Sequence, residues 1–490
     1  MSLLNRHSEA APEIPELSHI IAGERRLGGS SGTYAHVNPS TGQSQATVPL
    51  AGEEEVNAAV SAAKAAFPAW RSTAPEERRR ILERLAVLIG ENSERLARLS
   101  VLEFGGAVAF TRHLALLSRK FTNYYGGWAD RLEGQVAAHD EEAGFVYTIA
   151  EPLGVIAVIV TWNGPIVSLG MKVAPALAAG NTVVLKPAEI APFSSQAFVD
   201  LAREAGLPDG VLNLVHGGAA AGTALTAHPD VAKITFTGGA ATAQRILEGA
   251  ARNLTPAVME LGGKSANLVF PDADLDAACQ HTTLVGLSNA GQGCALPTRV
   301  LIHNDVYDEF LARLEASVSS LKVGDPLLDD TMVGPVISQA ASERILGIVD
   351  EASRTGAGRI VTGGKRLDGD LTDGWFISPT LLADVDPNSS VAQKEIFGPV
   401  ISVIRFSTEE EAVALANGTG YGLSAYIQSS DARRVRRLVS QLHCGTVGVN
   451  GGAPLTYNAP FGGLGLSGYG KEGGKAGIDE FLQLKTVLSA

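Results

Sequence analysis

Two glycine-rich stretches hold side chains that could carry out chemistry together. Glu260 lies in the run Met-Glu-Leu-Gly-Gly-Lys-Ser (259–265), and Cys294 follows Gly-Gln-Gly about one helix further along the chain. Glycines at these places permit tight turns and let a substrate approach the backbone closely. A thiol and a carboxylate that a fold brings together supply a nucleophile and a base. This is the chemistry that we expect of Cys294 and Glu260.

Both residues also have a plainer interpretation. A free cysteine commonly packs as a small buried hydrophobe, which we expect for Cys279 and Cys444. Cys294 differs because two glycines precede it near a predicted helix end. Glu260 could be a surface carboxylate, but its position at a strand end beside two glycines favours a site.

The residues before Glu260 alternate between apolar strands and helices. This pattern predicts a parallel sheet covered on both faces, and such sheets bind nucleotides at the carboxyl ends of their strands. The expected strands are 155–160, 181–185, 211–215, 232–236 and 257–260, and the expected helices are 165–180, 194–205, 219–228 and 240–253.

A second α/β pattern begins after Ser265 and places a domain boundary near Gly262. Its expected helices are 276–288, 307–321, 340–354 and 431–442, and its expected strands are 299–303, 400–406 and 446–450. Residues 485–489 are expected to form an edge strand. Before the first sheet, apolar residues at a spacing of three to four predict helices at 53–69 and 75–99.

Several glycine motifs resemble phosphate loops without fitting one. The fingerprint Gly-x-Gly-x-x-Gly begins at Gly463 and again at Gly468, but fewer than about twenty residues follow, too few for the βαβ unit that it requires. The run 263–265 ends like a Walker A loop, but Val258 stands where the first glycine should be. The stretch 236–239 is a better candidate, because backbone N–H groups meet the helix dipole there. An ordinary turn is its alternative.

Two other turns between a predicted strand and a helix carry polar side chains. Lys186 and Glu189 could hold the two hydroxyls of a ribose, or they could form an exposed ion pair. Asn163 could donate its amide to an oxyanion, or it could cap the helix that follows. The residues alone leave these alternatives open.

Composition excludes other classes of protein. The 490 residues suffice for two or three domains, and the net charge of −13 argues against a nucleic-acid surface, which needs a basic face. Apolar runs are too short to span a membrane, and the first twenty residues lack a secretory signal. The three cysteines show no metal-ligand spacing, so we expect a cytoplasmic protein without a metal site.

Jointly, these stretches resemble the aldehyde dehydrogenase superfamily from about residue 18 to the end. The matching runs are EPLGVIAVIVTWNGP, KVAPALAAGNTVVLKPAE, ITFTGG, MELGGKS, GQGCALPTR, KEIFGPV, YGLSAYI, GTVGVN and PFGGLGLSGYGKEGG. The resemblance implies an α/β fold with a Rossmann-like parallel-sheet NAD-binding domain (1–131 and 153–262), an α/β catalytic domain (263–470) and a small β oligomerisation segment (132–152 and 478–490). It also implies a homodimer or homotetramer.

The resemblance further implies oxidation of an aldehyde to a carboxylic acid through a thiohemiacetal and a thioester on Cys294. Asn163 and the Cys294 backbone N–H match the oxyanion hole, Glu260 matches the general base, and Glu472 matches a buried glutamate of a proton relay. Positions that match cofactor-binding residues are Val160, Trp162, Lys186, Glu189, Gly218, Phe236, Gly239, Leu261, Glu395 and Phe397. The carboxylate of Glu189 favours NAD over NADP as the cofactor, with NADP as an alternative.

Six positions match the substrate tunnel of the family and are small, mostly apolar and uncharged. These are Gly164, Met171, Ser288, Gly293, Ala295 and Leu455. They predict a bulky neutral aldehyde, aromatic or medium-chain aliphatic. Three alternatives are a CoA-acylating enzyme, which Glu260 argues against, a semialdehyde-specific enzyme, and a non-catalytic structural relative.

Overall fold

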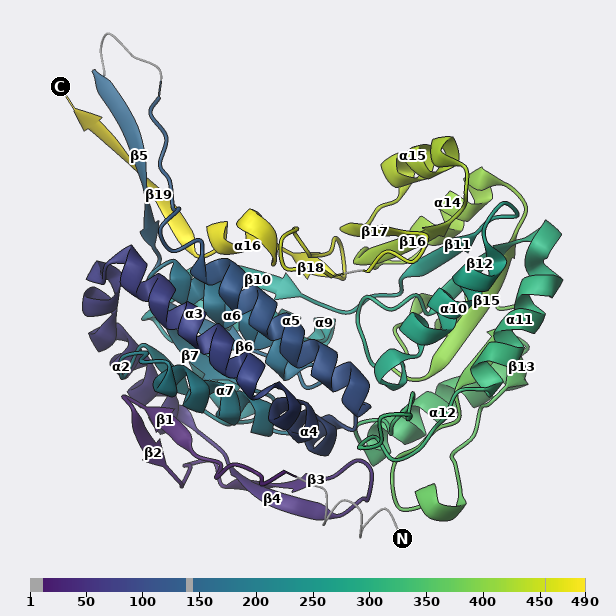
Figure 1. Cartoon of the computed structure of the whole chain (residues 1–490), viewed down its shortest axis with the longest axis horizontal. Helices are drawn as coiled ribbons and strands as arrows, with labels where there is room; N and C mark the ends of the chain where they lie inside the picture. Colours follow the sequence, from purple (N-terminus) through teal and green to yellow (C-terminus); the bar gives the residue numbers. More distant parts are fainter. Residues whose placement is uncertain (1–11, 138–143, 454, 490) are drawn as a thin grey trace.

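Two α/β units lie side by side, and a two-stranded arm extends from one of them (Figure 1). The computed structural model describes residues 12–137, 144–453 and 455–489. The start of the chain, residues 1–11, and residues 138–143 of the expected oligomerisation segment lie outside the described residues.

The first unit is built on an eight-stranded sheet with the order β18-β10-β9-β6-β7-β8-β1-β2. Strands β10, β9, β6, β7 and β8 pair in parallel. The pairs of β18 with β10, β1 with β8 and β2 with β1 are antiparallel. The bounds are β1 His19–Ile21, β2 Glu24–Arg26, β6 Val155–Ile159, β7 Thr182–Lys186, β8 Leu212–Leu214, β9 Val231–Thr237, β10 Ala257–Glu260 and β18 Gly468–Tyr469.

Helices cover both faces of this sheet, as expected for buried parallel strands. Along β6, Ile156 and Val158 join the apolar cluster of α3 to α7, whereas Val155, Ala157 and Ile159 join the cluster of α2, α8 and α9. The bounds are α2 Glu53–Ser72, α3 Pro75–Glu91, α4 Ser93–Phe104, α5 Val108–Gly126, α6 Pro165–Ala178, α7 Phe193–Glu204, α8 Ala219–Thr226 and α9 Ala240–Ala250.

The expected single helix 75–99 is wrong, because the chain breaks at Asn92 between α3 and α4. Asn92 has φ −99° and ψ 10°, and its side-chain amide donates to the carbonyl of Leu88 at 2.9 Å. A side chain that bonds to the preceding turn competes with the helix for its own backbone. An apolar periodicity that continues on both sides does not reveal such a break.

The second unit is a seven-stranded sheet with the order β13-β14-β15-β12-β11-β16-β17, in which β13 is antiparallel to β14. The strands are β11 Ala266–Val269, β12 Arg299–His303, β13 Arg359–Thr362, β14 Thr380–Ala383, β15 Val400–Phe406, β16 Ser424–Gln428 and β17 Thr446–Val449. The helices are α10 Leu275–Gly286, α11 Tyr307–Ser319, α12 Gln339–Arg354, α13 Ser390–Gln393, α14 Glu409–Asn417 and α15 Ala432–Gln441. The expected bounds of β10, β12 and β15 are confirmed.

The arm consists of β5 (Phe145–Pro152) and β19 (Leu482–Ser489), which pair antiparallel along their whole length and project from the body (Figure 1). The short helix α16 (Gly474–Asp479) precedes β19, and a hairpin of β3 (Thr33–Val37) and β4 (Ser44–Pro49) lies near the first sheet. Within the described ranges, no helix has the length and apolar character needed to cross a bilayer.

Candidate active site

Glu260 and Cys294 come together where the first sheet ends and the second begins. Glu260 is the last residue of β10, and the turn 261–265 leads into β11. A Cβ on Gly263 would lie 2.3 Å from the carbonyl oxygen of Cys294, and one on Gly262 would lie 2.2 Å from a carboxylate oxygen of Glu395. The turn can therefore touch the cysteine segment only because these positions are glycine.

A cavity of about 180 Å³ lies at this junction. It is bordered by Thr161, Trp162, Asn163, Thr237, Gly238, Gly239, Glu260, Leu261, Gly262, Cys294, Glu395 and Phe397. The rings of Trp162 and Phe397 meet edge to face, with centroids 5.3 Å apart. The cavity thus brings the expected nucleophile, base and oxyanion donor to one space.

A second cavity of about 370 Å³ opens along the carboxyl ends of the parallel strands. Its border includes Val160, Trp162, Lys186, Glu189, Gly218, Phe236 and Gly239. Lys186 Nζ lies 3.9 Å from the Glu189 carboxylate. All ten residues expected to bind the cofactor border one or both cavities.

Glu260 is almost fully buried, and neither of its carboxylate oxygens has a hydrogen-bond partner among the described residues. Burial, followed by the charge of Glu472, raises the pKa of Glu260 well above its ordinary value, and Lys172 and Lys471 act in the opposite direction. A carboxyl group with a raised pKa in a cavity is suited to general base catalysis near neutral pH.

Glu472 does not border the cavity and lies behind Glu260, where it forms a buried ion pair with Lys172. Lys172 also donates to the hydroxyl of Thr235 at 2.9 Å. The sequence reasoning missed Lys172, although a signal was available. It is the one charged residue of α6, a helix whose residues are all buried, and a buried lysine requires a partner.

The thiol of Cys294 is half-buried, and burial followed by the charges of Glu395 and Glu260 raises its pKa to about 12. Burial also raises the pKa of Glu395 to about 7, while the carboxylate accepts the Gly263 N–H at 3.0 Å. Near neutral pH the Cys294 thiol is therefore protonated until a cationic ligand or a base changes the balance, whereas Glu395 is protonated in about half of the molecules.

A network of amides joins Asn163 to the segment before Cys294. The Asn163 side chain donates to the Gln292 carbonyl at 3.0 Å, and the Asn289 side chain donates to the carbonyls of Asn163 and Gln292 at 3.2 and 3.1 Å. Gln292 donates in turn to the Asn289 carbonyl and accepts the Ile337 N–H. The sequence reasoning missed Asn289 and Gln292 because nothing local shows where their amides point.

The six residues expected to line the substrate tunnel are not among those that border the cavity at Cys294. Met171, Ala295 and Leu455 pack in the same apolar cluster as Cys294. Ser288 donates its hydroxyl to the Val285 carbonyl, and Gly164 is buried at the start of α6. Gly293 allows Leu296 to lie close, since a Cβ there would be 2.8 Å from its side chain.

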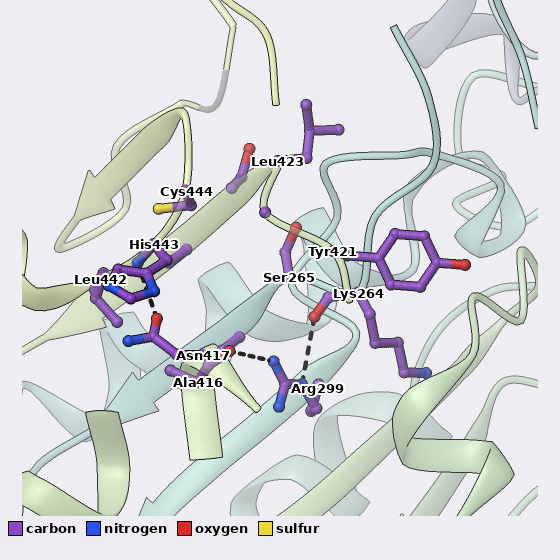
Figure 2. A pocket seen from close by; sticks show the side chains of 14 residues that line it. Lys264, Ser265, Arg299, Ala416, Asn417, Tyr421, Leu423, Leu442, His443 and Cys444 are labelled. Carbon is purple, nitrogen blue, oxygen red and sulfur yellow. Dashed lines mark hydrogen bonds between the residues drawn. The ribbon is translucent and has the colours of Figure 1, made fainter. Parts of the chain in front are cut away.

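A much smaller cavity, about 10 Å³, lies behind the turn 261–265 and is drawn in Figure 2. There Arg299 donates to the carbonyls of Lys264 and Ala416, so it ties the turn to the end of α14. The side chains of Lys264 and Tyr421 point away from Cys444 (Figure 2). This space holds about one water molecule, which suits an anchor for the turn and not a substrate site.

The parallel sheet, the cavity along its strand ends and the thiol and carboxylate at one end of it are features that fit the class of nucleotide-dependent enzymes with a cysteine nucleophile. Comparison with known proteins is more specific. The chain belongs to the aldehyde dehydrogenase family, which it matches over residues 27–487, and the members of this family are oxidoreductases that act on aldehydes.

Individual relatives cover almost the entire chain. An aldehyde dehydrogenase of Alternaria alternata is 40% identical over 459 residues, which are 93% of this chain and 91% of the relative. The crystal structure of a putative aldehyde dehydrogenase from Burkholderia cenocepacia superposes with a TM-score of 0.95 at 38% identity, covering 97% and 98% of the two chains. The structure of betaine aldehyde dehydrogenase from Staphylococcus aureus in complex with NAD+ superposes with a TM-score of 0.94 at 34% identity. The match covers 97% of this chain and 94% of that one.

Proposed function

We propose that this protein oxidises an aldehyde to the carboxylic acid with NAD, using Cys294 as nucleophile and Glu260 as general base. The observation that supports this most directly is that the cavity at Cys294 and the cavity along the strand ends share part of their lining. The shared residues are Thr161, Trp162, Thr237, Gly238 and Gly239. A dinucleotide that occupied the long cavity would therefore reach the thiol with one end.

The residues along the strand ends fit such a cofactor. Lys186 and Glu189 can hold ribose hydroxyls, and the N-terminus of α9 begins after Gly239, where a Cβ would meet open space. Backbone N–H groups at this end favour a pyrophosphate. Trp162 and Phe397 can flank the nicotinamide, and Glu395 can bind its ribose. When bound, NAD supplies the acceptor for a hydride.

In the proposed mechanism the thiolate of Cys294 attacks the aldehyde carbon and forms a thiohemiacetal. One N–H of the Asn163 amide bonds to Gln292, and the second N–H, with that of Cys294, binds the oxyanion. Loss of hydride leaves a thioester on Cys294. Glu260 takes a proton from a water molecule that attacks the thioester, which releases the acid and the thiolate. Glu472, paired with Lys172, takes the proton onward from Glu260.

Two variants test these roles. Cys294→Ala should abolish NADH formation and retain NAD binding, whereas Cys444→Ala, a matched control outside the cavity, should keep full activity. Glu260→Gln should release about one NADH per active site in a burst and then turn over slowly, because the thioester persists. Activity in Cys294→Ala would refute the nucleophile. Acceleration of the wild-type enzyme by coenzyme A would favour the acylating alternative.

For the substrate we propose a bulky neutral aldehyde, aromatic or medium-chain aliphatic. The support is the lack of a charged or aromatic side chain at Gly164 and Met171, together with the apolar core cluster to which Met171 and Ala295 belong and against which Leu455 and Cys294 pack. Rates with benzaldehyde, hexanal, acetaldehyde and succinate semialdehyde test it. A preference for acetaldehyde or for the semialdehyde would contradict the proposal.

A trimethylammonium aldehyde is the second candidate. The relative from Staphylococcus aureus is named for betaine aldehyde. In this chain Tyr124 meets both Trp128 and Tyr457 edge to face, with centroids 6.2 and 5.5 Å apart, and all three, like Cys294, pack against the main core cluster of the first unit. Aromatic faces attract quaternary ammonium groups, so betaine aldehyde belongs in the same panel.

We also propose that the chain is organised as the sequence resemblance implies, with an NAD-binding domain, a catalytic domain and an oligomerisation arm. The arm exposes Leu484 and Leu488 on one face and Phe145 on the other, each more than half accessible, and exposed apolar residues favour a protein contact. A homodimer or homotetramer would cover them. The free thiols of Cys279, Cys294 and Cys444 suit the reducing cytoplasm.

A further inference from the structure

The nucleophile loop, which we define as residues 292–298, follows a strained piece of backbone. Asn289, Ala290 and Gly291 have φ values of 49°, 53° and 69°. Residues other than glycine seldom adopt this left-handed conformation, which costs about 1–3 kcal/mol for each and persists only where the surroundings hold it. On this side of Cys294, the side-chain amides of Asn289 and Gln292 hold the backbone in this conformation by hydrogen bonds.

On the other side of Cys294, the loop is held by a tyrosine from the second sheet. Tyr426 Oη donates to the carbonyl of Ala295 at 2.6 Å. Tyr426 is fully buried in the middle of β16, and Ala295 is also buried. The hydrogen bond is therefore shielded from water, and a buried carbonyl that lost it would remain unpaired.

The place of Tyr426 is itself fixed from several sides. Its strand pairs in parallel with β11, at Asn267, and with β17, at Gly448. A Cβ on Gly448 would lie 2.7 Å from the tyrosine ring, so glycine makes the space for it. The ring of His281 packs beside it with a centroid distance of 5.3 Å. The hydroxyl is thus a rigidly held partner for the nucleophile loop.

We infer that Tyr426 is a positioning residue for the nucleophile, an inference that rests on the proposed function of Cys294. By holding the carbonyl of Ala295, it fixes the peptide between Ala295 and Leu296, one residue beyond Cys294. This keeps the thiol and the Cys294 N–H directed toward the cavity, although Asn289 and Ala290 on the other side of Cys294 have a strained backbone. Misplacement of a reacting group by about 1 Å can cost about 100-fold in rate.

Tyr426→Phe removes the hydroxyl and keeps the ring. A matched control is Tyr307→Phe, since Tyr307 is also buried, and its hydroxyl donates to Asp384 at 3.0 Å in a part of the second unit away from Cys294. For both variants and the wild type we would measure aldehyde turnover, the Kd of NAD, the melting temperature and the rate at which iodoacetamide alkylates Cys294 at pH 8, followed by mass spectrometry.

Tyr426→Phe should lower kcat at least about tenfold, leave the Kd of NAD unchanged, and raise the alkylation rate severalfold, because a released loop exposes the thiol to water and lowers its pKa toward the ordinary value. Tyr307→Phe should change none of the three. Unchanged turnover in Tyr426→Phe would overturn the inference. A fall in turnover together with weaker NAD binding and a lower melting temperature would also overturn it, because that combination indicates a general structural effect. A fall in turnover together with slower alkylation would overturn it as well.

A separate measurement, alkylation of the wild-type enzyme, tests whether Cys294 is the nucleophile. If complete alkylation of wild-type Cys294 leaves turnover intact, the proposed function fails and Tyr426 cannot act through this thiol. If alkylation stops turnover and Tyr426→Phe behaves as Tyr307→Phe does, the proposed function stands and the inference about Tyr426 is wrong.

Discussion

Replacing Gly462 by alanine should disable Glu260 by displacing its carboxylate, with the glutamate itself left in the sequence. Gly462 has φ 150°, and a Cβ there would lie 2.6 Å from Glu260 Oε1 and 2.6 Å from the carbonyl oxygen of Gly470. Ordinary contact begins at 3.4 Å, so the carboxylate must retreat by about 0.8 Å. A displacement near 1 Å costs about 100-fold in rate, which corresponds to about 2.7 kcal/mol of activation free energy.

The backbone strain of Gly462→Ala is a separate effect of about 1–3 kcal/mol on stability. Gly356→Ala is the matched control, because Gly356 has φ 73° and nothing within 4 Å of an added Cβ. Both variants should melt earlier than the wild type. Gly462→Ala alone should show an NADH burst followed by slow turnover, measured by stopped-flow absorbance. Wild-type turnover in a folded Gly462→Ala protein would refute the placement of Glu260 as the base.

Three further outcomes follow from the structure. Alkylation of Cys294 in the cofactor-free enzyme should accelerate about tenfold per pH unit from pH 7 to 10. The thiolate is the reactive form, and burial raises the pKa of the Cys294 thiol to about 12. A rate that levels off near pH 8 would contradict this. Glu103→Ala should lower the free energy of unfolding by about 2 kcal/mol in denaturant titrations. The reason is that the Glu103 carboxylate accepts the backbone N–H and the hydroxyl of Ser194 at the start of α7. An unchanged unfolding midpoint would show that these hydrogen bonds do not stabilise the protein. Leu484→Glu combined with Leu488→Glu should yield monomers in sedimentation, because charges oppose burial of the arm, and persistence of the wild-type assembly would place the contact elsewhere.

The central strands could be predicted from the sequence because their environment is uniform. Residues of β6 and β7 are buried on both faces, so a continuous apolar run identifies them. The edge strand β18 could not be predicted in this way. It consists of Gly468 and Tyr469, and its strand conformation depends on pairing with β10, more than two hundred residues earlier in the chain.

In the site, too, residues marked by their sequence neighbours could be predicted, and residues whose role depends on distant contacts could not. Cys294 and Glu260 are marked by the glycines beside them, which the structure needs for close contact. Tyr426 reads as one more apolar residue of a buried strand, and its hydroxyl matters only because the strand runs under Ala295. The rejected fingerprint glycines have a related role. A Cβ on Gly468 would lie 1.9 Å from the Met259 carbonyl, so these glycines allow the tail to pack against β10.

The pairing of β18 with β10 has a consequence for the order in which the enzyme is made. Met259 and Glu260 leave the ribosome long before Tyr469 and Gly468, which are their partners across the sheet. Glu472 follows, and it completes the charge environment of Glu260 through Lys172. Since domains fold as they emerge and distant pairings form slowly, a nascent chain can possess most of both α/β units while the surroundings of Glu260, the proposed base, are still incomplete. The surroundings of the proposed base would therefore be complete only once residues 468–472 have been added, after both α/β sheets have been synthesised.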